Sequence, residues 1–329
     1  MDSRTKRQLS PAQLQTLISD TLGAQIASSE ELTDGFANAV WRLGLADGRQ
    51  VVLKVSPPPD MEQLTYERHL LRTEALVYKL AASAGLPLPE LLRAGFDDSR
   101  LGGDYLILSA LDGTPWNQAI IPDSDHQVLR RELGAYLARL HTIPGDGVYG
   151  YPNARLTART WREAFLMMAG ALLDDAVRYA TPLPMSLLEI ARIIHTNAAA
   201  LDEVTSPALV HFDLWPGNVF LTFPGGRPRI QALIDHERAF WGDPLADFVS
   251  PTIFDRLRAD DPLLIGYRGA GGRVELTHET LVRDALYRFY LYLILLVENG
   301  PRQYPEEEYA RVRDLATKHL LRTADFLRS

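Results

Sequence analysis

The chain has 329 residues, of which 46% are hydrophobic and 23% charged, a balance typical of a globular protein large enough for two compact units. It contains no cysteine, which excludes disulfide bonds and thiolate metal sites, and its formal net charge of −8 argues against general nucleic-acid binding. The N-terminal segment has no apolar stretch behind its basic residues, so we do not expect a secretory signal. The longest apolar-rich run, 286–297, contains Arg288 and predicts a buried core helix rather than a membrane span. We therefore expect a cytoplasmic protein with no nucleic-acid or membrane partner.

The first part of the chain predicts a β-rich unit with one long helix. Short runs of β-branched residues bounded by glycine-containing turns are typical of strands, and apolar residues at helical spacing after a Ser-Pro pair are typical of a capped helix. The expected elements are a helix beginning at Ser10-Pro11, three strands within 26–55 with turns at Gly35 and Asp47-Gly48, a helix over 61–84, and strands at 88–94 and 105–109.

Beyond a linker at 109–115, helices dominate the predicted structure. The fold class that follows is α+β, with a small β-rich N-lobe over 1–110, a larger helical C-lobe over 111–329, and a cleft between them. The elements expected in the second lobe are helices at 125–142, 160–179, 184–202, 279–298 and 305–327, and strands at 219–223 and 229–234.

The most informative segment is 210–221, with the sequence VHFDLWPGNVFL. Asp213 and Asn218 lie five residues apart around a Trp-Pro-Gly turn, and Asp235 ends the strand pair that follows. Two carboxylates and an amide oxygen can therefore converge at one end of a hairpin. Hard oxygen ligands of this kind suit Mg²⁺, and phosphoryl transfer needs them together with a carboxylate that orients and deprotonates a hydroxyl.

The pattern H-x-D-x-x-x-x-N, followed by a strand that ends in Ile-Asp, resembles the aminoglycoside phosphotransferase and choline kinase family of the protein-kinase-like superfamily. The resemblance covers most of the chain up to about residue 250, and the order and spacing of its separate elements make it specific. It implies a bilobal protein-kinase-like fold that binds ATP and Mg²⁺. The other elements that carry it are Lys54 in a third strand, Glu74 on the following helix, LSALDG at 108–113, LARLH at 137–141 and WGDPLADF at 241–248.

The resemblance also implies roles for individual residues. Asp213 corresponds to the catalytic base, and Asn218 and Asp235 correspond to the two Mg²⁺ ligands. Lys54 corresponds to the residue that holds the α- and β-phosphates, and an ion pair with Glu74 would fix its position.

Four further residues have implied supporting roles. Backbone groups around Ser109 and Leu111 would contact the adenine at the hinge between the lobes. His211 would support the backbone of the catalytic loop rather than touch substrate, and Asp247 would brace the same loop.

The sequence departs from protein kinases at three places. The glycine-rich motif is absent, since 34–40 has the sequence DGFANAV, a loss common in small-molecule kinases of this branch. Asp235 is followed by His236 and Glu237 rather than by Phe-Gly, and no A-P-E motif follows. We interpret His236 and Glu237 as an exposed pair at a strand end rather than as metal ligands. Phe212 stands where relatives often have a small, polar or basic residue, and the sequence does not indicate its effect.

The expected function is transfer of the ATP γ-phosphoryl group to a hydroxyl of a small molecule, with an aminoglycoside-type or other antibiotic as the first candidate. A metabolite kinase acting on choline, an amino sugar or another alcohol is the main alternative. Other classes are a catalytically inactive nucleotide-binding scaffold, a protein kinase, and a zinc hydrolase built on His211, Asp213 and His236. The sequence does not indicate the acceptor, the preference between ATP and GTP, or the oligomeric state.

The acidic composition suggests a cationic acceptor, because carboxylates not used by the metal would leave a negative field at the acceptor site. The alternative is that these groups lie on the surface and only confer solubility. The carboxylates concerned are Glu237, Asp243, Asp255, Asp260, Asp261 and Glu298.

Overall fold

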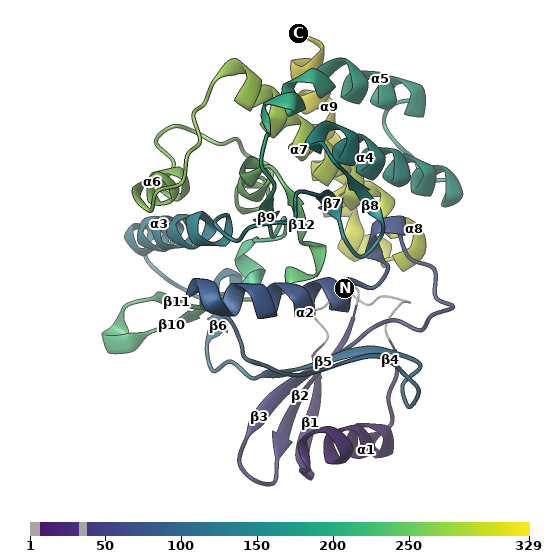
Figure 1. The fold of residues 1–329 in the computed structure, drawn as a ribbon, viewed down its shortest axis with the longest axis vertical. Helices are drawn as coiled ribbons and strands as arrows, with labels where there is room; N and C mark the ends of the chain where they lie inside the picture. Colours follow the sequence, from purple (N-terminus) through teal and green to yellow (C-terminus); the bar gives the residue numbers. More distant parts are fainter. Residues whose placement is uncertain (1–6, 33–37) are drawn as a thin grey trace.

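The computed structural model describes residues 7–32 and 38–329, and it has two lobes (Figure 1). One end of the molecule is a five-stranded antiparallel sheet in the order β1-β2-β3-β5-β4. The predicted turn at Gly35 lies outside the described residues. The strands of this sheet are β1 (Ile26–Leu32), β2 (Ala39–Leu45), β3 (Gln50–Val55), β4 (Leu91–Asp98) and β5 (Gly103–Ser109).

Two helices cover opposite faces of the sheet. Helix α1 (Pro11–Leu22) begins at an N-cap formed by Ser10, whose side chain accepts from the backbone of Gln13, and its apolar side packs against β2 and β3. Helix α2 (Leu70–Ala81) packs against the other face, through Leu106 and Leu108 of β5. Lys54 lies directly across from Leu106 in the sheet, so it faces α2.

The helix predicted over 61–84 is wrong in its first third. Thr65–Glu67 forms a single 3₁₀ turn, and His69 has a φ of 59°, so the α-helix begins only at Leu70. The reason is tertiary: the segment before His69 packs on the second lobe, and Tyr66 belongs to the core of that lobe.

The second lobe is helical around one large apolar core. Four predicted helices are confirmed within two or three residues, while the helix expected over 184–202 is α5 followed by a 3₁₀ segment. Helix α6 was not predicted; its backbone crosses α3 so closely that a Cβ on Gly134 would lie 2.0 Å from the Leu263 carbonyl. The helices are α3 (Asp123–Leu140), α4 (Trp161–Arg178), α5 (Leu187–Asn197), α6 (Pro262–Gly269), α7 (His278–Val297), α8 (Asn299–Arg302) and α9 (Glu306–Arg328).

Two small sheets complete the second lobe. One has the order β11-β10-β6 and the other β8-β7-β12-β9. Both predicted strands, at 219–223 and 229–234, are confirmed as β10 and β11. The strands are β6 (Thr114–Pro115), β7 (Tyr149–Tyr151), β8 (Leu156–Ala158), β9 (Ala208–Val210), β10 (Val219–Thr222), β11 (Arg229–Leu233) and β12 (Phe240–Gly242).

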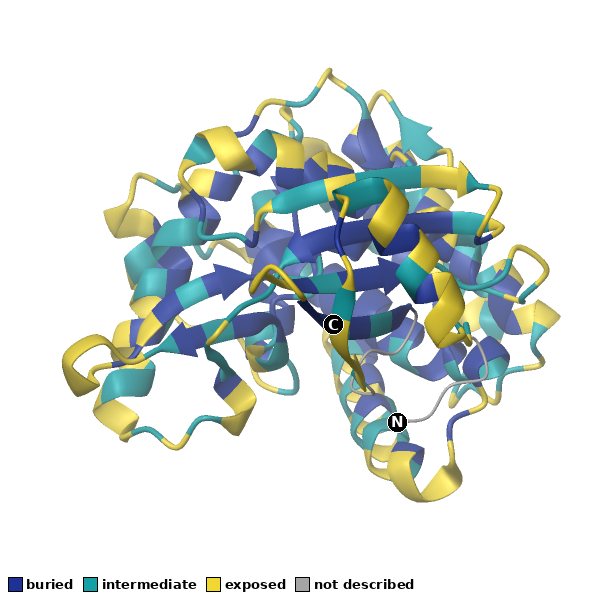
Figure 2. Cartoon of the chain, turned by 90° about the horizontal axis from the view of Figure 1, so that it is seen from below, coloured by how far each residue is buried: buried dark blue, intermediate teal, exposed yellow. Residues whose placement is uncertain are grey.

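Buried residues gather in the interior of the molecule, and exposed residues lie on its outer helices and loops (Figure 2). The aromatic side chains of α7 are buried in the core, as expected, and Arg288 among them pairs with Asp284 on the same helix. None of the helices in the described residues is long and apolar enough to cross a membrane. The predicted border between the lobes, at 110/111, stays a prediction. Leu64 and Tyr66 lie before this border in the sequence, yet their side chains pack in the core of the second lobe.

Candidate active site

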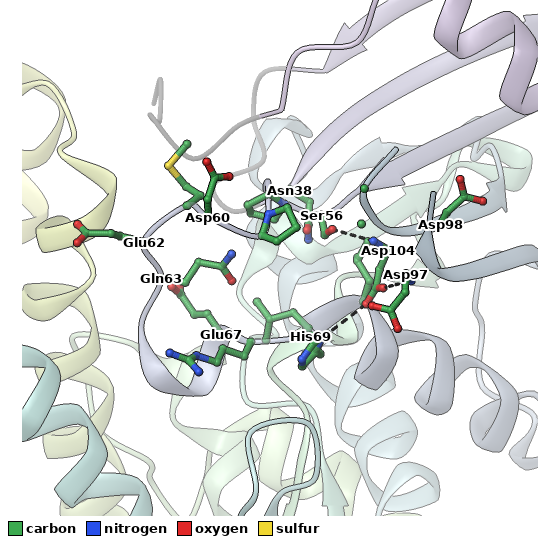
Figure 3. Close-up of a pocket in the computed structure, with 18 of the residues that line it drawn as sticks. Asn38, Ser56, Asp60, Glu62, Gln63, Glu67, His69, Asp97, Asp98 and Asp104 are labelled. Atoms are coloured by element: carbon green, nitrogen blue, oxygen red, sulfur yellow. Dashed lines mark hydrogen bonds and ion pairs between the residues drawn. The ribbon is translucent and has the colours of Figure 1, made fainter. Parts of the chain in front are cut away.

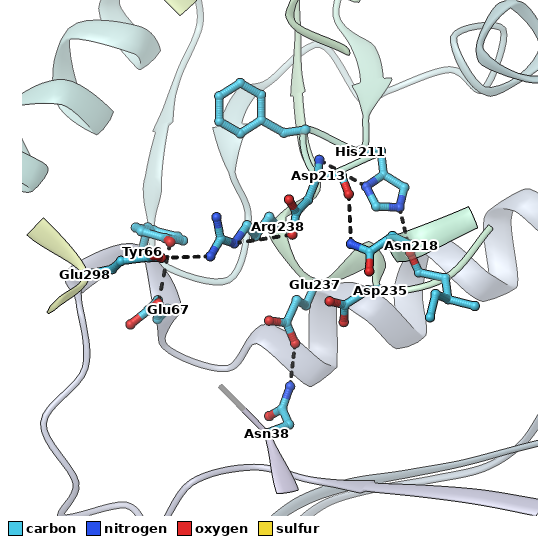
Figure 4. Close-up of polar contacts among 12 residues, drawn as sticks. Asn38, Tyr66, Glu67, His211, Asp213, Asn218, Asp235, Glu237, Arg238 and Glu298 are labelled. Carbon is cyan, nitrogen blue, oxygen red and sulfur yellow. Dashed lines mark hydrogen bonds and ion pairs between the residues drawn. The ribbon is translucent and has the colours of Figure 1, made fainter. Parts of the chain in front are cut away.

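Four segments far apart in the sequence meet between the two lobes. β3 contributes Lys54 and α2 contributes Glu74 from the first lobe. The loop between β9 and β10 contributes Asp213, and the residue pair after β11 contributes Asp235 (Figure 4). The residues that the sequence analysis selected for chemistry therefore come together in space.

Lys54 lies between two carboxylates. Its Nζ is 2.7 Å from Glu74 Oε1 and 2.7 Å from Asp235 Oδ1. Burial alone would lower the pKa of Lys54, but the Asp235 and Glu74 carboxylates raise it well above its usual range, so the ammonium group stays charged. Tyr78, one helical turn after Glu74, donates to Glu74 Oε1 at 3.1 Å and helps to fix that carboxylate.

Asp213 presents its carboxylate from the turn that leads to β10. Within residues 7–32 and 38–329, no hydrogen bond is formed to its carboxylate oxygens, and the nearest cation is Arg238, whose Nε lies 3.8 Å from Oδ2. Burial raises the pKa of Asp213 to about 7, while Arg238 acts in the opposite direction. The oxygens of Asp213 are therefore free to accept a hydrogen bond from a hydroxyl group.

The loop that carries Asp213 is held by a buried carboxylate. Asp247 accepts from the backbone N–H of His211 at 3.0 Å and of Phe212 at 2.6 Å, and it also bonds to His141 at 2.9 Å. His211 in turn bonds to the Ile234 carbonyl through Nε2 and accepts from the Asp213 N–H through Nδ1. These contacts tie the loop to the end of β11.

Phe212 has a left-handed backbone, with a φ of 66°. Its ring is buried against Phe240 and Tyr290, at centroid distances of 5.1 and 6.0 Å. This packing answers the question that the sequence left open: the ring anchors the loop in the core and turns away from the reacting groups. A non-glycine residue with positive φ is strained, and such residues are common at functional sites.

The donor set fits a hard divalent cation. Oxygen atoms of Glu74, Asp235 and Glu237 all lie within 4.8 Å of one another. Asn218 uses its Nδ2 to donate to the Asp213 carbonyl at 2.8 Å, which leaves its amide oxygen for a ligand. Carboxylate and amide oxygens are the ligands that Mg²⁺ prefers.

A zinc site on His211, Asp213 and His236 does not fit the structure. Both ring nitrogens of His211 already have hydrogen-bond partners, Ile234 and Asp213, so neither is available to a metal. His236 is fully buried between the rings of His211 and Tyr78.

The interpretation of His236 and Glu237 as an exposed pair is wrong. His236 is 0% and Glu237 5% exposed. Glu237 bonds to the side chain of Asn38, the residue before β2, so the segment after Asp235 packs between the lobes instead of reaching solvent. The burial of Glu237 could not be predicted from the sequence, because its partner Asn38 belongs to the other lobe.

The hinge residues lie at the end of β5. The N–H of Ser109 donates to the Glu90 carbonyl, and its hydroxyl accepts from the Glu90 N–H. The N–H of Ala110 donates to the Gln50 carbonyl. Leu111 follows in the loop to β6, so among these residues its backbone is the better placed to offer a hydrogen bond to a base.

A group of charged residues beside Asp213 was missed by the sequence analysis. Arg238 bonds to Glu298 at the end of α7 (Figure 4). Glu298 also bonds to Arg302 of α8, and Arg302 bonds to Glu67. Arg238 stands three residues after Asp235, but no spacing in the sequence points to its distant partners.

Comparison with known proteins agrees with this geometry. Residues 28–283 match the model of a family described as the phosphotransferase enzyme family. Two curated proteins also match: mouse acyl-CoA dehydrogenase family member 10, 23% identical over 267 residues, and chicken acyl-CoA dehydrogenase family member 11, 27% identical over 195 residues. The matches cover 78% and 56% of this chain but only 23% of each relative, so the chain spans about a quarter of the length of these proteins.

Solved structures share the fold over nearly the whole chain. A candidate fructosamine-3-kinase from Thermobifida fusca is 21% identical, with a TM-score of 0.66, and the match covers 94% of this chain and 98% of that one. A macrolide 2'-phosphotransferase from Brachybacterium faecium is 19% identical, with a TM-score of 0.60 and coverage of 93% and 97%. An aminoglycoside phosphotransferase in complex with AMP-PNP and hygromycin B is 19% identical, with a TM-score of 0.62 and coverage of 95% and 98%. The bilobal protein-kinase-like fold is thereby confirmed.

Proposed function

The chain belongs to the phosphotransferase enzyme family, and on this basis we propose that it transfers the γ-phosphoryl group of ATP to a hydroxyl of a small molecule, in the presence of Mg²⁺. The observation that carries the proposal is the position of Lys54, whose ammonium group bridges Glu74 of the first lobe and Asp235 of the second. A nucleotide substrate is also supported by neighbours of this fold whose structures contain AMP-PNP, ADP or GDP.

In the proposed reaction, the acceptor hydroxyl donates its proton to Asp213 as its oxygen forms a bond to the γ-phosphorus. The bond from that phosphorus to the bridging oxygen breaks, and ADP leaves with the electron pair. Lys54 holds the α- and β-phosphates, and Glu74 keeps Lys54 in place. His211 and Asp247 fix the backbone that carries Asp213.

Asn218 and Asp235 are the residues that would hold Mg²⁺. When bound, the ion neutralises the charge of the phosphates. Glu237 shares a group of oxygens with Asp235 and Glu74, and it also accepts a hydrogen bond from Asn38. We keep Asn218 and Asp235 as the proposed ligands.

The intact set of Lys54, Glu74, Asp213, Asn218 and Asp235 argues against an inactive scaffold. Among acceptors, an aminoglycoside-type or other antibiotic stays our first candidate, supported by the fold shared with aminoglycoside and macrolide phosphotransferases. The fructosamine-3-kinase neighbour supports a metabolite kinase as the alternative. We place the protein in the cytoplasm, where ATP is available.

The test is a screen for ATP consumption across aminoglycosides, macrolides, sugar amines and simple alcohols. A true acceptor gains one phosphoryl group in mass, and the gain disappears when Mg²⁺ is chelated and returns when it is restored. The matched control is Asp213→Asn, which keeps the shape of the side chain and removes the proton acceptor. A protein that neither binds ATP nor modifies any acceptor would refute the proposal, and phosphoryl transfer by Asp213→Asn at the wild-type rate would refute the assigned base.

A further inference from the structure

Asp213 is the end of a buried row of alternating charges. Arg238 Nε lies 3.8 Å from Asp213 Oδ2, and Arg238 Nη2 lies 3.0 Å from Glu298 Oε2. The same Glu298 oxygen lies 3.0 Å from Arg302 Nη1. Arg302 Nη2 then pairs with Glu67 Oε1. We call Glu67, Arg302, Glu298 and Arg238 the relay.

The relay is almost completely shielded from water. Side-chain exposure is 9% for Arg238, 8% for Glu298, 2% for Arg302 and 5% for Glu67. Buried charges have strong mutual interactions and are costly when a partner is lost, because the remaining charge is left without compensation. Each member of the relay therefore holds its neighbours in place, unlike an exposed ion pair, which contributes little.

The far end of the relay belongs to the connection between β3 and α2. This connection is fixed on the second lobe: the N–H of Thr65 donates to Asp175 at 2.6 Å, and Asn153 donates to the Tyr66 carbonyl at 3.0 Å. Glu67 also accepts from the Leu64 N–H at 3.0 Å. The connection leads directly into α2, which carries Glu74. The relay thus joins the segment that carries the phosphate-binding groups to the residue beside the base.

The contact between Arg238 and Asp213 has a particular geometry. The separation of 3.8 Å is beyond a hydrogen bond but within the range of an ion pair. Arg238 can therefore attract and orient the carboxylate without occupying an oxygen that the acceptor hydroxyl needs. Arginine suits this task because its rigid fork lets it bind Glu298 and face Asp213 at the same time.

We propose that Arg238 is a positioning residue for Asp213, and that Glu67, through Arg302 and Glu298, sets the position of Arg238. The inference rests on the proposed function, in which Asp213 is the base. It adds that the β3–α2 connection takes part in orienting that base, although Glu67 does not contact Asp213.

A cavity of about 720 Å³ lies beside this connection, and Glu67 and Arg302 are part of its wall (Figure 3). The residues that line it include neither Asp213 nor Lys54. Glu67 therefore borders a space other than the one over the base. The cavity gives no sign of direct contact between Glu67 and the reacting groups. A change at Glu67 that acts through the relay should lower kcat, whereas one that acts through α2 and Glu74 should change KM for ATP.

The test compares Glu67→Gln with Asp284→Asn, each in the full chain. Both replace a buried carboxylate that pairs with a buried arginine by its amide, but Asp284 pairs with Arg288 and has no link to the relay. Two readouts are taken: the Mg²⁺-dependent hydrolysis of ATP with water as the acceptor, and crystal structures of both variants. Thermal melting checks that both remain folded.

We expect Glu67→Gln to lower kcat for ATP hydrolysis by about 3- to 30-fold with an unchanged KM for ATP, and to move the Arg238 guanidinium away from Asp213. Asp284→Asn should do neither. In the double variant with Arg238→Lys, the loss should be less than the product of the single losses, because both act on one row. An Arg238 that stays in place in Glu67→Gln, or equal kcat in the two carboxylate variants, overturns the relay. Absence of ATP binding and hydrolysis by the wild type would instead overturn the proposed function, and the two crystal structures would then decide the relay alone.

Discussion

Replacement of Asp247 by alanine is expected to release the loop that carries Asp213. Asp247 is 0% exposed and accepts from two successive backbone N–H groups, those of His211 and Phe212, as well as bonding to His141. A hydrogen bond to a charged group contributes about 1.5–3 kcal/mol. Losing the two backbone bonds alone therefore destabilises the native conformation of this loop by about 3 kcal/mol or more. The strained φ of Phe212 adds to the tendency of the loop to leave its native conformation.

This cost can be read from amide hydrogen exchange. A loss of about 3 kcal/mol corresponds to roughly 10²-fold faster exchange at His211 and Phe212, where each 1.4 kcal/mol is a factor of ten. Turnover should fall by a similar factor, because misplacing a catalytic group by about 1 Å can cost about 10²-fold. Asp284→Ala is the control, since Asp284 is also buried and paired, but its partner is Arg288 on its own helix rather than this loop. Exchange at the two amides within about threefold of wild type would show that Asp247 does not hold the loop.

Four other changes probe the remaining assigned residues. Asp213→Asn should lower turnover by about 10²–10⁴-fold with little change in ATP affinity measured by calorimetry, and activity within a few-fold of wild type would contradict its role as base. Asp235→Ala should raise the Mg²⁺ concentration needed for half-maximal turnover, measured by Mg²⁺ titration at saturating ATP; an unchanged requirement would remove Asp235 from the ligand set. Lys54→Ala should raise KM for ATP and lower kcat, with Glu74→Gln giving a milder form of the same defect in steady-state kinetics, and silent variants would contradict the phosphate-binding role.

Most helices and strands could be predicted because their signals, such as capping residues and strand-forming residues, lie within the elements themselves. Helix α1 has its capping residues in the sequence, and β3 is rich in strand-forming valine. The exception at 61–69 shows where such rules fail. That segment carries no strong helix breaker between Met61 and His69, yet Thr65 and Tyr66 lie in a 3₁₀ turn instead of the α-helix, held by partners more than eighty residues away.

The candidate site likewise contains residues that the sequence predicted and residues that it did not. Asp213 and Asp235 were predicted from their spacing around one hairpin, and Lys54 and Glu74 through the resemblance to a known family. The structure brings Lys54 into contact with both Glu74 and Asp235. Arg238 was missed, since its importance depends on Glu298, sixty residues further along the chain. Burial of a charged residue is a tertiary property, and a single sequence carries no signal of it.

The expectation of a cationic acceptor loses much of its basis when the acidic residues are placed. It assumed carboxylates with no internal partner, but Asp243 binds Arg283, Asp261 binds Arg130, and Glu298 binds two arginines. A carboxylate that is paired at close range has little field at a distance, because the opposite charge cancels it within a few ångströms. The formal net charge of −8 already includes the arginine partners, and it does not indicate which carboxylates are paired or where the unpaired ones lie. The charge of the acceptor therefore depends on the few groups that face it, and beside Asp213 the nearest of these is an arginine.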